Sequence, residues 1–154
     1  MKQDAFGYMP ICFNIRGKRC LVVGGGNVAY RKIALIKRFG ANVICISPEF
    51  IKPIQALETR KNIKCIKKKY PGSGMSLKKY ELVISATDDP EVNIRVARNA
   101  FRDRTLVNVV DKSIEGTVIM PAILKKKGLL LSVSTGGSSP SRAKKIRDIL
   151  KNAL

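Results

Sequence analysis

A run of three glycines, Gly24 to Gly26, is the feature that most constrains the fold of this 154-residue chain. It follows residues 19–23, a short apolar run typical of a buried parallel strand. In residues 27–39, which come next, apolar side chains recur at helical spacing. In the pattern Gly24-x-Gly26-x-x-Ala29, the glycines let the backbone approach a pyrophosphate, which the helix N-terminus binds. The pattern predicts dinucleotide binding, with an ordinary structural turn as the alternative.

The sequence continues with alternating strand and helix patterns. Short apolar segments predict strands at 42–46, 63–66, 81–85 and 106–110. A helix is expected over 49–58. A second helix should run to about Arg102, because Asp88-Asp89-Pro90-Glu91 supplies an N-cap, a proline at the first position and an acidic first turn.

The last part of the chain does not continue the alternation of strand and helix patterns. Pro121 interrupts the apolar residues 118–124, and a turn is expected at 125–128, followed by a strand at 129–133 and a basic amphipathic helix over 141–153. These patterns indicate antiparallel strands added after the parallel sheet, not another β-α unit. The predicted fold class is therefore α/β, with a Rossmann-like parallel sheet in residues 1–112 followed by a small α+β segment in residues 113–154.

Charge and composition limit the classes of function. Lys and Arg number 30 against 11 Asp and Glu, so the net charge of +19 predicts a polyanionic partner: nucleic acid, an anionic membrane or an acidic small molecule. The absence of histidine excludes Ser-His-Asp and Cys-His catalysis and imidazole metal sites. The cysteines form no C-x-x-C pair and are expected to be free thiols, buried in the case of Cys20 and Cys45. No apolar run could span a bilayer or act as a signal sequence, so we expect a cytoplasmic protein.

The cofactor is predicted to be NAD. The acid that usually follows the second strand and binds the ribose hydroxyls is replaced by Ser47, with Glu49 two residues further on. A serine can bind a ribose hydroxyl, and no arginine follows to hold the extra phosphate of NADP. Thr87, after the fourth strand, should lie near the nicotinamide. The predicted cofactor-binding residues are Gly24, Gly26, Asn27, Val28, Ser47 and Thr87.

Five segments in this order and spacing resemble precorrin-2 dehydrogenase, the dehydrogenase/ferrochelatase module of siroheme synthases. They are Gly24-Gly-Gly-Asn-Val-Ala-Tyr-Arg-Lys32, Ala86-Thr-Asp-Asp-Pro-Glu-Val-Asn93, Asn108-Val-Val-Asp111, Ile119-Met-Pro-Ala122 and Ser134-Thr-Gly-Gly-Ser-Ser-Pro140. The resemblance implies NAD-dependent oxidation of precorrin-2 to sirohydrochlorin, in some members followed by insertion of ferrous iron. Both tetrapyrroles are rich in carboxylates, which would account for the basic charge without nucleic acid or a membrane.

The resemblance also implies a homodimer in which residues 113–154 interlock with the partner and help to form the tetrapyrrole site. Asp111 matches the family's catalytic aspartate, and a carboxylate is a suitable base in a chain without histidine; a turn-capping aspartate is the alternative. Predicted substrate-binding residues are Asn93, Ser134, Gly136, Gly137 and Ser138. Family members usually continue into a further helical domain, so a separate protein could supply that part, and iron insertion is the less secure activity.

Two other classes of function remain open at this point. A nucleic-acid-binding protein would explain the charge, but it should carry aromatic platforms, whereas this chain has no tryptophan and only 6% aromatic residues. A regulatory module that senses NAD would explain the glycines. It gives no reason for the motifs between Asp111 and Pro140.

Overall fold

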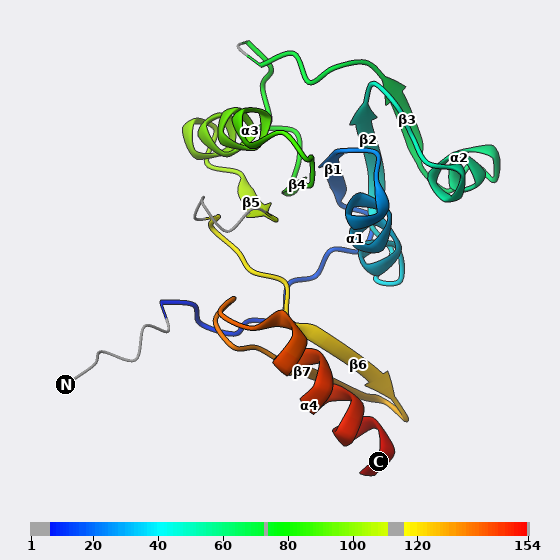
Figure 1. The fold of residues 1–154 in the computed structure, drawn as a ribbon, viewed down its shortest axis with the longest axis vertical. Coiled ribbons are helices and arrows are strands. Elements are labelled where there is room, and N and C mark those ends of the chain that lie inside the picture. Colours follow the sequence, from blue (N-terminus) through cyan, green and yellow to red (C-terminus); the bar gives the residue numbers. More distant parts are fainter. Residues whose placement is uncertain (1–6, 73, 111–115, 154) are drawn as a thin grey trace. The chain divides into compact units, whose positions relative to one another are not determined.

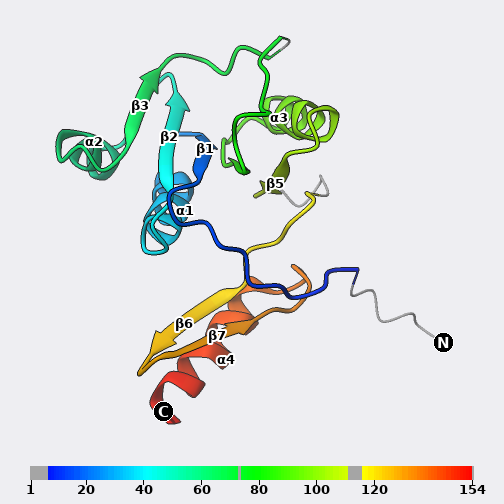
Figure 2. The ribbon, with the colours of Figure 1, turned by 180° about the vertical axis from the view of Figure 1, so that it is seen from behind.

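The structure, a computed structural model, describes residues 7–72, 74–110 and 116–153 (Figures 1 and 2). It forms two compact units: Phe13–Thr117, and Val118 to the C-terminus together with the described residues up to Cys12. The domain limits 1–112 and 113–154 stay a prediction. No helix in the described part is long and apolar enough to cross a membrane.

The larger unit is a five-stranded parallel sheet with helices, which confirms the Rossmann-like fold (Figure 1). Its strands lie in the order β3-β2-β1-β4-β5. Their bounds are β1 (Arg19–Val23), β2 (Asn42–Ser47), β3 (Lys64–Lys67), β4 (Leu82–Ser85) and β5 (Leu106–Val109). The helices are α1 (Asn27–Lys37), α2 (Lys52–Thr59) and α3 (Pro90–Arg102). The strand order reverses at β1, so the carboxyl ends of β1 and β4 mark the topological switch point where such sheets bind ligands.

The sheet is buried on both faces, as continuous apolar strands require. Leu21 and Val23 belong to a core cluster that includes residues from α3 and from the loop before β4. On α1, which packs against β1, β2 and β4, Ala29, Ile33 and Ile36 are buried. Cys20 and Cys45 are buried free thiols, as predicted. The middle strands are therefore held by packing on both faces, and so is the turn that follows β1.

One predicted boundary is wrong for a local reason. The helix expected over 49–58 begins only at Lys52, because Pro53 fixes the first turn and the preceding Ile51 is extended (φ −66°, ψ 153°). The Ile51 amide donates to the Gly25 carbonyl at 3.0 Å. This bond ties the segment between β2 and α2, residues 48–51, to the glycine turn.

The connection from β3 to β4 is a long loop that side chains of α3 hold in place. Asn99 Nδ2 donates to the Tyr70 hydroxyl at 2.8 Å and to the Gly72 carbonyl at 2.7 Å. The Asp103 carboxylate, 4% exposed, accepts from the Leu77 amide and from Arg102 Nε. Tyr70 and Leu77 are themselves buried in the core. The loop therefore covers a sheet face that a helix commonly covers in this fold class.

The smaller unit is an antiparallel hairpin packed against one helix. β6 (Ala122–Lys126) pairs with β7 (Leu129–Val133), and α4 (Pro140–Ala153) contacts both strands. The turn is shorter than the predicted 125–128: it consists of Lys127 and Gly128, both with positive φ (48° and 79°), as a tight hairpin turn requires. Ala143 is the buried residue of α4. A small α+β segment after the parallel sheet is confirmed.

Asp103 makes the stability of the fold depend on pH. Hydrogen bonds from Arg102 and from the Leu77 amide lower the pKa of this carboxyl to about 2. A carboxyl whose pKa is lower in the folded state stabilises the fold above its unfolded pKa of about 3.9, and this stabilisation is lost as the pH falls toward 2. We expect Asp103→Asn to lower the melting temperature by a few degrees at pH 7, with a difference from wild type that shrinks between pH 4 and pH 2. Thermal melts of both proteins across this range measure it. A difference independent of pH would show that the carboxylate charge is not the cause.

Candidate functional site

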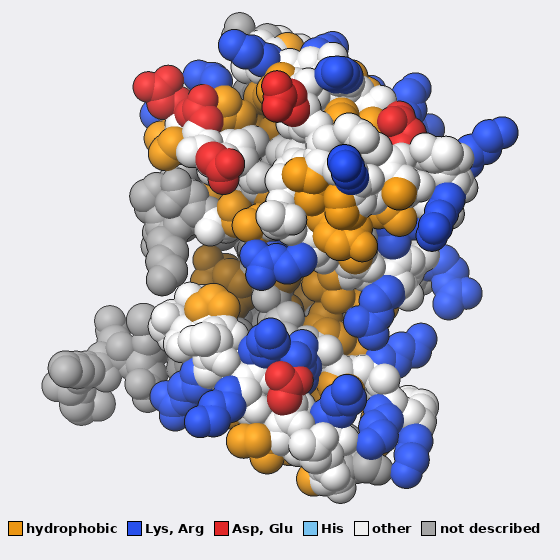
Figure 3. All heavy atoms as spheres, turned by 45° about the vertical axis from the view of Figure 1, so that its right-hand side comes forward, with side chains coloured by type: hydrophobic (Ala, Val, Ile, Leu, Met, Phe, Trp, Pro, Cys, Tyr) orange, Lys and Arg blue, Asp and Glu red, His pale blue; other side chains and the backbone are white. Residues whose placement is uncertain are grey.

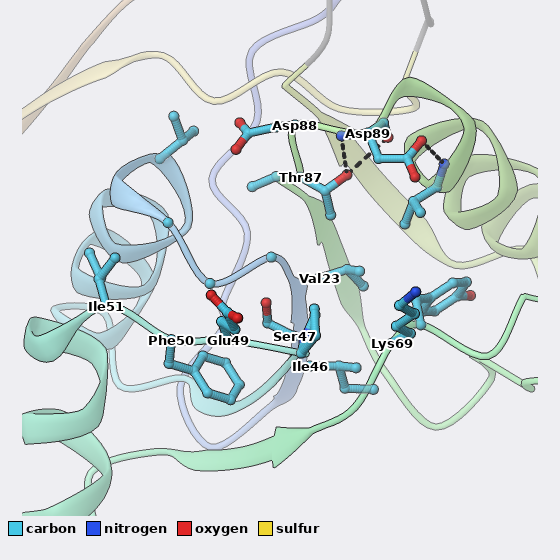
Figure 4. Close-up of a pocket in the computed structure, with 18 of the residues that line it drawn as sticks. Val23, Ile46, Ser47, Glu49, Phe50, Ile51, Lys69, Thr87, Asp88 and Asp89 are labelled. Atoms are coloured by element: carbon cyan, nitrogen blue, oxygen red, sulfur yellow. Dashed lines mark hydrogen bonds between the residues drawn. The ribbon is translucent and has the colours of Figure 1, made fainter.

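A pocket of about 880 Å³ lies at the carboxyl ends of β1, β2 and β4 (Figure 4). Its volume is within the range of small-molecule and cofactor sites. All six residues that the sequence predicts to bind the cofactor line it: Gly24, Gly26, Asn27, Val28, Ser47 and Thr87. The fold thus brings together residues from three separate turns, and their contact with a cofactor stays a prediction.

The three glycines have different surroundings. Gly24 has φ +129°, and a β-carbon on it would lie 2.1 Å from the Ala86 carbonyl oxygen. A β-carbon on Gly25 would lie 1.8 Å from the Glu49 carbonyl oxygen. At Gly26, by contrast, a β-carbon would meet nothing within 4 Å. The first two glycines are needed for packing between strand ends, whereas the third faces the open pocket.

The N-terminus of α1 opens at this turn. Gly26 is its N-cap, with no side-chain cap and no acidic residue in the first turn. The first amide groups of the helix and its positive dipole end therefore have no side-chain anion of their own. This arrangement, beside a pocket wall without a β-carbon, fits the pyrophosphate of a dinucleotide.

The segment after β2 forms another wall of the pocket. Ser47 is 8% exposed at the strand end, and Glu49 and Phe50 follow it in the segment between β2 and α2. Figure 4 shows the Glu49 carboxylate near the glycine turn, with the Phe50 ring beside it. Glu49 and Phe50 were not among the predicted site residues. Their position directly after a parallel strand is the signal that could have identified them.

Asn93 holds the turn after β4 from inside the protein. Its Oδ1 accepts from Ser85 Oγ at 2.6 Å and from the Thr87 amide at 3.3 Å, while its Nδ2 donates to the Thr87 carbonyl at 3.0 Å. The side chain is 1% exposed. Its polar atoms are thus engaged within the chain, where they hold the Thr87 turn, and contact of Asn93 with substrate stays a prediction.

A buried thiol supports the glycine turn from the other side. Cys45 Sγ donates to the Gly24 carbonyl at 3.1 Å. Burial raises the pKa of this thiol to about 12, and burial raises that of Cys20 to about 11. Thiolates are the reactive form of cysteine, so both side chains act as packing residues rather than as nucleophiles.

The remaining predicted residues are Asp111 and four residues of the smaller unit. Asp111 falls outside the described residues; the preceding Val110 donates its amide to the Ser85 carbonyl at 3.0 Å, at the carboxyl edge of β4. Ser134, Gly136, Gly137 and Ser138 belong to the smaller unit, in the turn between β7 and α4. In that turn Gly136 N donates to Ser134 Oγ at 3.1 Å and Ser138 Oγ to the Thr135 carbonyl at 2.6 Å.

Two cationic side chains in the pocket wall were not predicted. Lys69 comes from the loop after β3, and Arg95 comes from α3. Of the two, only Lys69 could have been identified from the sequence, because it follows a parallel strand by two residues. Among the described residues, no three His, Cys, Asp or Glu side chains form a group that could hold a metal ion.

Comparisons with known proteins agree with this geometry. Residues 11–122 match the sequence model of the family described as "Putative NAD(P)-binding". The siroheme synthases of Saccharophagus degradans and Nitrosococcus oceani are 36% and 38% identical to the chain over 147 residues. Each match covers 96% of this chain, which spans about a third of the length of those relatives.

A solved structure is similar along the same extent. It is titled "SirC, precorrin-2 dehydrogenase", and it superposes with a TM-score of 0.81 and 26% sequence identity. The match covers 96% of this chain and 71% of that one. Together with the sequence matches, it confirms the resemblance inferred from the five ordered motifs.

The unequal surroundings of the glycines can be tested by substitution. Gly26→Asp should leave the melting temperature near that of wild type, because nothing lies within 4 Å of the new β-carbon. It should weaken NAD or NADP binding by about tenfold or more, since a carboxylate would face the pyrophosphate. Gly25→Ala is the matched control and should destabilise the fold. Calorimetry and thermal melts measure both effects, and an unchanged dinucleotide affinity in Gly26→Asp would contradict the assignment of this turn.

Proposed function

The chain belongs to the NAD(P)-binding family whose sequence model matches its residues 11–122, and on this premise we propose that it is an NAD-dependent precorrin-2 dehydrogenase of siroheme biosynthesis. The observation that carries the proposal is the glycine turn that opens into a pocket at the switch point of the sheet. Similarity to siroheme synthases and to a precorrin-2 dehydrogenase along 96% of the chain supports the choice of reaction. The reaction oxidises precorrin-2 to sirohydrochlorin.

The cofactor site is built from the chain's own backbone. The α1 N-terminus at Gly26 would bind the pyrophosphate, while Ser47 and Glu49 would face the adenosine ribose and Thr87 the nicotinamide half. A bound nicotinamide dinucleotide supplies the hydride acceptor that a dehydrogenation needs. The protein's part is to fix its position, and Asn93 contributes by holding the Thr87 turn.

Glu49 supports NAD over NADP. Its carboxylate lines the pocket beside Ser47, where the adenosine ribose of a dinucleotide lies in this fold class. A carboxylate can accept hydrogen bonds from the ribose hydroxyls, and it repels the additional phosphate of NADP. The acid that the sequence pattern lacked directly after the strand is thus supplied two residues later.

Asp111 is proposed as the group that takes up the proton. Removal of a hydride and a proton from precorrin-2 leaves the oxidised macrocycle, and the proton needs an acceptor. Val110, the preceding residue, is bonded to the end of β4, which carries the Thr87 turn. A carboxylate that follows this point is suited to the role of general base. Asp111 would also serve the transfer of protons from pyrrole nitrogens if ferrous iron is inserted as a second activity.

The smaller unit is proposed to form a homodimer and to contribute the Ser134–Ser138 turn to the substrate site. Its surface supports the proposal, because several large apolar side chains are exposed on β7 and α4: Leu129, Leu130, Ile146, Ile149 and Leu150. Ile146, Ile149 and Leu150 recur at helical spacing and so share one face of α4, and an exposed apolar face is typical of a protein interface.

Removal of the negative charge of Glu49 tests its role in cofactor preference. Glu49→Gln should lower the ratio of kcat/KM for NAD to that for NADP by about tenfold, because the repulsion of the extra phosphate disappears. Glu81→Gln is the matched control: it removes the same charge just before β4, at the opposite edge of the sheet. Initial rates of precorrin-2 oxidation with each cofactor measure the ratio. Equal ratios in the two variants would remove Glu49 from cofactor selection.

The proton acceptor is tested by Asp111→Asn, which keeps the shape of the side chain but not its basicity. Turnover of precorrin-2, followed by NADH formation at saturating NAD, should fall by about a hundred- to ten-thousand-fold. NAD affinity and melting temperature should stay near wild type. A structural cap would give the opposite result, with a loss of roughly 1 kcal/mol in stability and little change in rate.

A further inference from the structure

Two cationic residues, Lys69 and Arg95, line the pocket wall, and the proposed mode of cofactor binding assigns no role to either of them. Both side chains are exposed. Figure 4 shows Lys69 across the pocket from Glu49 and Phe50, so it lies away from the wall assigned to the adenosine ribose. Lys69 and Glu49 therefore lie in different parts of one cavity, whose lining also includes Arg95 and the acids Asp88 and Asp89.

The segment that carries Lys69 is fixed relative to Arg95. Tyr70 is 8% exposed, and its hydroxyl and the Gly72 carbonyl both accept from Asn99, which lies one turn beyond Arg95 on α3. Gly72 has φ +69°, and a β-carbon on it would lie 3.5 Å from Arg95 Cδ and 3.7 Å from its Nε. The loop that carries Lys69 thus passes beside the Arg95 side chain at Gly72. The backbone positions of both residues are therefore fixed before a ligand binds, which lowers the entropic cost of binding.

Little of this positive charge is neutralised within the chain. Arg95 has Glu91 at 3.7 Å, and that carboxylate is 85% exposed. A guanidinium has five N–H donors, so such a contact leaves most of them available. Among the described residues, no carboxylate lies within ion-pair distance of Lys69. An anion bound in this part of the pocket would therefore meet positive charge that the chain itself does not neutralise.

We propose that Lys69 and Arg95 form an anion subsite of the pocket that binds a carboxylate of the substrate. The inference rests on the proposed function for its choice of ligand, a polycarboxylate tetrapyrrole. The α1 N-terminus already provides for the pyrophosphate, which leaves the cations on the facing wall for a second anion. A phosphate of the cofactor shares the required chemistry, and the experiment distinguishes the two sources.

Binding is measured with uroporphyrin, a stable polycarboxylate porphyrin, through its fluorescence in a buffer of low salt. Lys69→Gln and Arg95→Gln are compared with Lys68→Gln and Arg98→Gln. The two controls remove the same charges from the same loop and helix, at exposed positions that do not line the pocket. Melting temperatures of all four should match wild type. We expect each pocket variant to weaken uroporphyrin binding by about five- to tenfold, and each control by less than about twofold.

The source of the anion is decided by calorimetry with NAD. Unchanged NAD affinity in Lys69→Gln and Arg95→Gln, together with weaker uroporphyrin binding, supports the carboxylate subsite. Weaker NAD binding with unchanged uroporphyrin binding overturns it in favour of a cofactor phosphate. Equal losses in all four variants would mean that only net charge matters, and this also overturns the subsite.

The proposed function is tested separately, by NADH formation from precorrin-2 with the wild-type protein. If the wild type does not oxidise precorrin-2 but the pocket variants bind uroporphyrin more weakly than the controls, the proposed subsite is supported and the proposed activity is contradicted. If the wild type oxidises precorrin-2 and the KM for precorrin-2 is the same in pocket and control variants, the proposed activity is supported and the proposed subsite is contradicted.

Discussion

The site depends on a close approach of strand ends that only glycine permits. Gly24 lies against the Ala86 carbonyl after β4, and Gly25 lies against the Glu49 carbonyl after β2. A β-carbon at either position would push a neighbouring backbone away, so the turn and the strand ends on both sides of it form one unit. The pocket has its walls because these ends meet. Gly26 differs from the other two, since the space beside it is the pocket itself.

The parallel sheet and its ligand-binding edge could be predicted because they rest on local signals. Each strand is a short apolar run, and the residues after β1, β2 and β4 reach the same edge whatever the rest of the chain does. The course of residues 68–80 could not be predicted. The loop has no periodicity, and its position is set by Asn99 and Asp103, which lie some distance away in the sequence. Those contacts bring the loop beside α3, and Lys69 and Arg95 line the same pocket.

The charge of the chain acts at two different ranges. A net charge of +19 attracts a polyanion over a distance comparable to the Debye length, and Figure 3 shows Lys and Arg spread over the face that it draws. Inside the pocket the signs are mixed, with Glu49 on one wall and Lys69 on another. General attraction would bring an acidic ligand to the protein. Its orientation requires charges held at fixed places by the fold.

Asn93 connects the two chemical parts of the proposed site. On one side its amide bonds both backbone groups of Thr87, in the pocket wall; on the other it accepts from Ser85 Oγ, and the Ser85 carbonyl accepts from Val110, the residue before Asp111. Asn93 and Ser85 are buried, and a buried polar group left without a partner costs about 1–3 kcal/mol. The amide therefore cannot shift without breaking bonds on both sides. Asn93, a single side chain in the first turns of α3, thus links the Thr87 wall of the pocket to the end of β4, to which the residue before the proposed base is bonded.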